Sequence, residues 1–137
     1  MDAYPPDAAL PHPTEITRPF WDALSQRRVC IQRCGDCGRW VFYPRPRCNA
    51  CLSDRLEWRT VSGRGRLYSF TVSHQPAPLR FPGIASPVLA IVELAEGIHM
   101  TSTLVKVDGV RVRIGMALRP FFDQVDEKLT LLKFQPE

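Results

Sequence analysis

The stretch CGDCGRWVFYPRPRCNAC, residues 34–51, holds four of the five cysteines of this 137-residue chain, in two CxxC pairs. With two residues between cysteines, both sulfurs of a pair can point the same way, and the Pro-rich segment between the pairs returns the chain to complete a tetrahedron. The spacing therefore predicts one metal site made by Cys34, Cys37, Cys48 and Cys51. Two disulfides or a thioredoxin-like pair fit badly, because the first residues do not resemble a secretory signal and a redox site needs only one pair.

The predicted ion has a structural role. Four thiolates saturate a tetrahedral site and leave no position for water or substrate, so Zn²⁺ held by them should contribute directly to folding. Iron in a rubredoxin-like cage for electron transfer uses the same ligands, and sulfur ligation alone does not separate the two metals. The fifth cysteine, Cys30, lies in an alternating apolar stretch and is expected to be a buried, inert thiol.

Positive charge is concentrated around this stretch. The net charge is +4, and ten of the fifteen arginines fall between Arg27 and Arg66, where only three acids accompany them. Such a field attracts phosphate, whether on nucleic acid, a nucleotide-bearing cofactor or an acidic partner. Alternatively, the arginines only solvate a small module.

Upstream of the cysteines, the pattern predicts a short helix. Residues 1–16 are rich in proline and small polar residues and are expected to form a mobile tail. A helical segment follows at 17–28, in which Thr17 can cap the N-terminus and Phe20, Trp21 and Leu24 share one face. The metal-binding ribbon is then expected at 29–55.

Downstream, short β-rich segments recur between turns. They are Leu56–Val61, Gly65–His74, Pro87–Leu94, His99–Val105, Met116–Phe122 and Leu129–Phe134. Five or six such strands predict a small antiparallel barrel over 56–137, and their number and length fit the OB fold, with a long loop from Gln75 to Ser86 placed to bind something. The predicted fold is therefore mainly β: an N-terminal helix, a rubredoxin-like zinc ribbon and a C-terminal OB-fold antiparallel barrel.

The sequence offers no self-sufficient catalytic group. No phosphate-binding, zinc-protease or nucleophile-elbow motif is present, and the carboxylates are scattered. His74 and His99 lie at expected strand ends, where a histidine is more often a surface residue than a base. No apolar run is long enough to cross a bilayer, so a cytoplasmic location is expected.

Several motifs in a fixed order carry a resemblance. They are Pro19-Phe20-Trp21-Asp22-Ala23-Leu24, Gln32-Arg33-Cys34-Gly35-Asp36-Cys37-Gly38, Tyr43-Pro44-Arg45-Pro46-Arg47-Cys48, Gly65-Arg66-Leu67-Tyr68-Ser69-Phe70-Thr71-Val72, Ala90-Ile91-Val92-Glu93-Leu94, Glu96-Gly97 and Arg113-Ile114-Gly115-Met116. From about Thr17 to Gln135 the chain resembles the zinc-ribbon plus OB-fold proteins associated with acyl-CoA metabolism, a family long catalogued only as a domain of unknown function.

The resemblance implies a function as well as a fold. Members of that family are partners of thiolase-superfamily enzymes: thiolases, hydroxymethylglutaryl-CoA synthase and thiolase-like aldolases that cleave steroid side chains. It therefore implies a non-catalytic accessory subunit, required by a thiolase-like aldolase (a carbon–carbon lyase) or acyltransferase. This subunit would stabilise the thiolase-like chain in a hetero-oligomer and help enclose the acyl-CoA.

Two groups of residues are candidates for these contacts. The arginines expected to meet CoA phosphates are Arg45, Arg47, Arg64 and Arg66. The residues expected at the partner interface are Phe20, Trp21, His74, Leu79 and Phe81, and Tyr68 is a further aromatic candidate.

A single-stranded nucleic-acid-binding module is the competing hypothesis, because zinc ribbons and OB barrels both serve that purpose and the ribbon is basic. Against it, the barrel strands show no evident series of exposed aromatics interleaved with basic residues.

Overall fold

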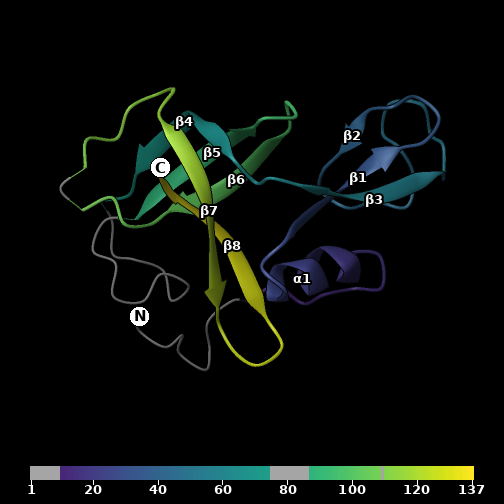
Figure 1. Cartoon of the computed structure of the whole chain (residues 1–137), viewed down its shortest axis with the longest axis horizontal. Coiled ribbons are helices and arrows are strands. Elements are labelled where there is room, and N and C mark those ends of the chain that lie inside the picture. The colour runs from purple at the N-terminus through teal and green to yellow at the C-terminus, as the bar shows by residue number, and fades with distance from the viewer. Residues whose placement is uncertain (1–9, 75–86, 109) are drawn as a thin grey trace.

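A computed structural model describes residues 10–74, 87–108 and 110–137. Within these ranges the chain forms one helix and eight strands, arranged as a three-stranded sheet and a closed barrel (Figure 1). The predicted mainly β architecture is confirmed. None of the helical segments that the structure describes has the length and apolar character needed to cross a membrane.

Helix α1 covers Arg18–Ser25 and is shorter than the predicted segment 17–28. Thr17 occupies the N-cap position, but the predicted capping bond is wrong, because its side chain makes no hydrogen bond to the first turn. Its hydroxyl accepts instead from the Thr14 backbone N–H at 2.8 Å. At the other end Arg27 takes a positive φ of 58°, and the helix stops before it.

The ribbon sheet has the order β2-β1-β3, with β1 at Val29–Cys34, β2 at Trp40–Val41 and β3 at Leu56–Val61. The prediction that Leu56–Val61 belongs to the barrel is wrong, since β3 pairs with β1 along its whole length, from Val29 opposite Val61 to Cys34 opposite Leu56. Strand β1 is buried at five of its six positions, and the two-residue β2 covers only part of one edge. Because a strand so deeply buried needs partners for its backbone groups on both edges, β3 completes the ribbon.

The barrel contains β4 (Gly65–Val72), β5 (Val88–Leu94), β6 (His99–Leu104), β7 (Ala117–Gln124) and β8 (Thr130–Pro136). The strands close in the order β4-β5-β6-β8-β7, as expected for an OB fold. The prediction of a purely antiparallel barrel needs one correction: β6 and β8 are parallel and pair only where Leu104 lies opposite Phe134.

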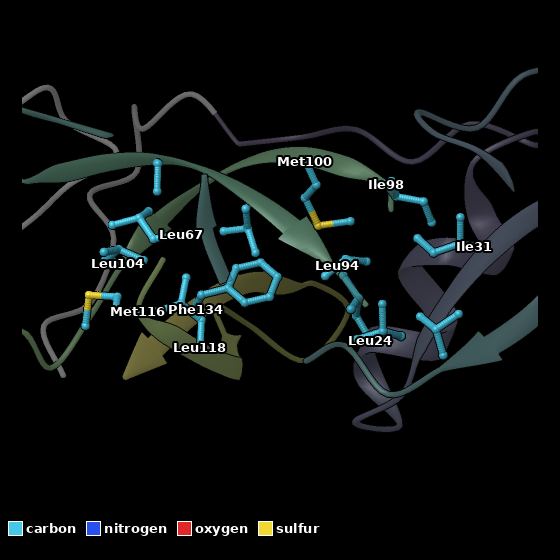
Figure 2. Close-up of a cluster of buried hydrophobic side chains, with 14 of the residues drawn as sticks. Leu24, Ile31, Leu67, Leu94, Ile98, Met100, Leu104, Met116, Leu118 and Phe134 are labelled. Carbon is cyan, nitrogen blue, oxygen red and sulfur yellow. The ribbon is translucent and has the colours of Figure 1, made fainter. Parts of the chain in front are cut away.

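One hydrophobic core joins the barrel to the ribbon and the helix. Leu24 of α1 and Ile31 of β1 belong to the same buried cluster as Leu94, Ile98 and Phe134 (Figure 2). A second, much smaller cluster lies inside the ribbon and consists of Cys34, Val41 and Cys48, with Leu56 packed against it. The outer part of the ribbon therefore has very little apolar surface of its own to bury.

The joint between ribbon and barrel is tightly packed. It consists of residues 62–64, between β3 and β4. Gly63 has a φ of +74°, and a Cβ atom there would lie 2.9 Å from Val29 Cγ2 and 3.0 Å from Pro120 Cγ. A side chain at this position would be both strained and in collision with its neighbours.

Candidate metal centre and ligand-binding surfaces

The four predicted cysteines converge at one end of the ribbon. The Sγ atoms of Cys34, Cys37, Cys48 and Cys51 all lie within 4.8 Å of one another. The closest approaches join the two pairs: Cys34 Sγ lies 3.5 Å from Cys51 Sγ, and Cys37 Sγ lies 3.7 Å from Cys48 Sγ. Four sulfurs at this spacing, with no other ligand type in the set, fit the tetrahedral coordination of one zinc ion.

The two CxxC turns share the same backbone design. Cys34 Sγ accepts the backbone N–H groups of Asp36 and Cys37, each at 3.4 Å. Cys48 Sγ likewise accepts from Ala50 at 3.4 Å. Each turn closes on a residue with positive φ, which is Gly38 at 76° in the first turn and Leu52 at 65° in the second. N–H donors aimed at the sulfurs favour thiolates, the form in which cysteine binds metal.

These hydrogen bonds and the contacts between the sulfurs give the thiols different pKa values. The Cys37 backbone N–H is the main cause that lowers the pKa of Cys34 to about 6. The Cys51 backbone N–H does the same for Cys48, whose pKa is also lowered. The Ser53 backbone N–H favours the Cys51 thiolate too, but the adjacent Cys34 sulfur and burial outweigh it and raise the pKa of Cys51 to about 12. Four crowded sulfurs therefore ionise together only when a cation neutralises them.

A polar network outside the cage links the two turns. The Asp36 carboxylate accepts from the Ser53 hydroxyl and from Arg55 Nη1, the latter at 2.7 Å. The Gly35 backbone N–H donates to the Arg55 carbonyl at 2.7 Å. These contacts fix the first turn to the segment that follows the second turn, so they orient both cysteine pairs.

The four arginines predicted to meet phosphate divide into two kinds. Arg45 and Arg47 lie exposed in the ribbon, and among the described residues their side chains donate to the carbonyls of Tyr43 and Leu52, at 3.3 and 3.2 Å. Arg64 and Arg66 lie at the start of β4 and form ion pairs. The partner of Arg64 is Glu137, and Arg66 Nη2 lies 2.8 Å from the Glu93 carboxylate.

Sequence reasoning missed a polar cluster on the outer face of the barrel. The Glu93 carboxylate binds Arg66 through Oε1 and His99 Nε2 through Oε2, the latter at 2.9 Å. The His99 ring lies against the Tyr68 ring with 4.2 Å between centroids. The available signal was the Glu96-Gly97 turn: a hairpin centred there places Glu93 opposite His99, which is the observed register.

The Glu93 contacts make a testable prediction about acid titration. Chiefly the hydrogen bond from His99, and then the one from Arg66, lower the pKa of Glu93 from its ordinary value near 4.5. The contribution of Glu93 to stability is therefore complete above that ordinary value and is lost as the pH falls through the lower folded pKa. We expect His99→Ala to raise the Glu93 pKa toward 4.5 in an NMR titration of its carboxyl carbon. His74→Ala, the control, should leave it unchanged.

The residues predicted at a partner interface have different surroundings. Phe20 is only 4% exposed and packs in the core against Trp21 and Phe42, on the apolar face of the helix that covers the barrel. Its contact with a partner stays a prediction. Trp21 is half-buried, and its indole N–H is buried without a hydrogen-bond partner among the described residues. His74 is exposed just after β4.

Leu79 and Phe81, together with the whole predicted loop from Gln75 to Ser86, lie outside the described residues.

A groove of about 670 Å³ runs beside Trp21 between the helix, the ribbon and the barrel. Its walls are mostly apolar, with hydroxyl groups from β6 along one side. They comprise Leu10, Pro11, Phe20, Trp21, Phe42, Tyr43, Leu89, His99, Met100, Thr101, Ser102, Thr103, Leu131, Leu132 and Lys133. A volume of this size and mostly apolar walls with a few polar groups are typical of sites that bind an apolar group.

The fold and the cysteine cage define a protein with a rubredoxin-like zinc ribbon and an OB-fold barrel, and comparison with known proteins agrees. Residues 21–57 match the family model described as the ChsH2 rubredoxin-like zinc ribbon domain, and residues 58–123 match the model described as the ChsH2 C-terminal OB-fold domain. A DUF35 domain-containing scaffold protein of Methanothermobacter thermautotrophicus is 36% identical over 84% of this chain and 86% of its own length. The chain belongs to this DUF35, or ChsH2-type, family.

Other relatives are longer proteins or parts of complexes. A "Probable enoyl-CoA hydratase alpha subunit" of Thermomonospora curvata and the 3-oxo-4,17-pregnadiene-20-carboxyl-CoA hydratase alpha subunit of Mycobacterium tuberculosis are each 38% identical to this chain. The chain spans only 41% and 37% of their lengths. A chain of the solved "Ltp2-ChsH2(DUF35) aldolase" is 32% identical, with a TM-score of 0.80 over 93% of this chain and 98% of that one.

Proposed function

We propose that this protein is a non-catalytic accessory subunit of a hetero-oligomeric complex that acts on acyl-CoA thioesters. The partner would be a thiolase-like chain, and the reaction would be retro-aldol cleavage, as in steroid side-chain degradation, or a thiolase reaction. The observation that carries the proposal is the likeness, over nearly the whole of both chains, to a chain of the Ltp2-ChsH2(DUF35) aldolase. The relatives named as scaffold proteins support the same role.

The zinc ribbon would act as the rigid part of this scaffold. A site with four cysteine ligands is closed, so zinc there orders the ribbon rather than binding substrate. Arg45 and Arg47 are exposed, and within the described part of the chain each side chain donates to one carbonyl of this ordered segment. Most of their guanidinium donors therefore remain available to a phosphate.

The partner interface would include Trp21 and His74, together with Leu79 and Phe81 beyond the described part. Trp21 supports this assignment because its buried N–H has no acceptor in the described part of the chain, and a buried donor of this kind is costly unless something satisfies it. An acceptor on the partner that meets Trp21 at the groove would remove that cost. Half-buried tryptophans are also frequent energetic centres of interfaces.

Co-expression tests the proposal. The chain should co-purify in a defined stoichiometry with a thiolase-like protein encoded beside it, and the complex should convert an acyl-CoA that neither chain converts alone. Trp21→Ala should reduce the yield of complex, whereas Ile114→Ala, which removes a side chain that is 60% exposed, should not. Turnover of thioesters by this chain alone would contradict the accessory role.

The hydratase relatives suggest a second partner class for the same experiment. Two of them are named as hydratase alpha subunits, and this chain corresponds to less than half of each. Stable assembly with a hydratase subunit, and none with a thiolase-like chain, would keep the accessory role and change the reaction.

A further inference from the structure

We propose that the outer face of β4–β6 binds the adenine nucleotide end of CoA, with the adenine ring on Tyr68 and the phosphates at Arg64 and Arg66. The inference rests on the proposed function, because it names the part of the thioester substrate that this chain holds. The site is formed by Arg64, Arg66, Tyr68, Glu93 and His99, called the β4 row below.

Arg66 and Tyr68 belong to β4, and Arg64 lies directly before its first residue, Gly65. Because the pairing with β5 shifts after Leu67, exposure rather than regular strand alternation assigns these side chains to the outer surface. All three are exposed. The opposite face of the strand is the core side, where Leu67 is buried.

A β-bulge presents Tyr68. Leu67 pairs with Val92 and Ser69 pairs with Ile91, so Tyr68 has no partner on β5. Bulges of this kind re-aim a side chain and are frequent beside binding sites. The tyrosine is 52% exposed, and Ile91 beside the bulge is 36% exposed, so aromatic and aliphatic surface remains available to a ligand.

His99 and Glu93 hold the tyrosine ring in place. The two rings lie 4.2 Å apart at an interplanar angle of 37°, and Glu93 fixes the imidazole through its Nε2 atom. The phenol is therefore a supported stacking surface rather than a freely rotating side chain. A planar base can stack on such a surface whatever its sequence context.

The arginines supply the anion-binding half. They line a hollow of about 550 Å³ together with Gly65, Glu93, Leu94, Ala95 and Gly97. Each guanidinium has five donors, and the contacts of Arg64 with Glu137 and of Arg66 with Glu93 use only part of them. The remaining donors face solvent, because the two side chains are 65% and 68% exposed.

A single stacking position favours one nucleotide over a nucleic-acid strand. Single-stranded nucleic acid needs several aromatic surfaces in succession along a basic groove. Among the described residues of the barrel's outer face, only Tyr68 and His99 offer exposed rings, and they are stacked on each other.

The test is titration calorimetry of the full-length chain with adenosine 3′,5′-bisphosphate, CoA, ADP, pantetheine and oligo-dA, with NMR mapping of shifted residues. We expect the bisphosphate and CoA to bind alike and more tightly than ADP, and pantetheine not to bind. Tyr68→Ala should weaken binding by about tenfold or more, Tyr68→Trp should preserve it, and Arg64→Ala should weaken it and flatten its salt dependence. Ile114→Ala removes an exposed side chain outside the β4 row and should leave nucleotide binding unchanged.

Several results would overturn the inference. They are absence of binding by the bisphosphate, equal binding by the Tyr68→Ala variant, tighter binding of ADP than of CoA, or affinity for oligo-dA that grows with its length. Assembly with the thiolase-like chain is a separate readout. If the Tyr68→Ala variant still assembles and the bisphosphate never binds, the inference fails and the accessory function stands. If neither a thiolase-like chain nor a hydratase subunit ever binds, the accessory function fails instead.

Discussion

Replacing Cys34 or Cys48 with serine should unfold the ribbon and abolish assembly with the partner. Both cysteines are buried, and both belong to the only cluster of side chains inside the outer ribbon, so each provides a ligand and part of a very small core. Structural zinc contributes about 10–16 kcal/mol to the folding of zinc-finger peptides, far more than so few apolar contacts can replace. Zinc content, ribbon amide shifts in NMR spectra and pull-down yield should all fall together.

The fifth cysteine is the matched control. Cys30 is also buried, but it lies outside the cage and its sulfur contacts Arg28 and Thr60. Cys30→Ser should keep one zinc per chain and an intact ribbon. A Cys34→Ser protein that lost zinc but retained both ribbon structure and partner binding would contradict the structural role of the ion.

Truncating Phe134 should destabilise the barrel by about 3–5 kcal/mol, the usual cost of Phe→Ala in a core. The side chain is fully buried at the centre of the main cluster. It also lies at the single point where β6 and β8 pair, opposite Leu104. The cavity left by Phe134→Ala would therefore form beside the single-residue pairing of β6 and β8. We expect the lost stability to appear as a lower midpoint of urea unfolding followed by circular dichroism.

The control for this variant is Ile114→Ala. Ile114 is 60% exposed, so its removal should change stability by no more than about 0.5 kcal/mol. A Phe134→Ala protein as stable as that control would mean that the core drawn in Figure 2 does not hold the barrel together.

The metal centre was predictable because its information is local. Ligand identity and spacing within residues 34–51 determine the cage, and Gly38 provides the positive φ that the first turn needs. Leu52 performs the same task in the second turn, and nothing in its chemistry indicates this, since leucine seldom adopts such a conformation.

The errors share a different origin, which is pairing between distant segments. The sequence of Leu56–Val61 has ordinary strand character, and only the need of β1 for a second neighbour assigns it to the ribbon. The burial of Phe20 in the shared core likewise depends on contacts between distant segments, which the helix pattern alone does not reveal. The Glu93–His99–Tyr68 cluster needs three strands in register, together with a bulge that single-strand alternation does not reveal.

The crowded glycine between β3 and β4 has a consequence for recognition. With Gly63 wedged against Val29 and Pro120, and with helix, ribbon and barrel sharing one interior, the two lobes have little room to pivot. A partner that contacts both lobes would bind a preorganised surface. This chain would therefore lose little conformational freedom on association. A substitution that loosens this packing should slow association with the partner, even when every residue that contacts the partner is unchanged.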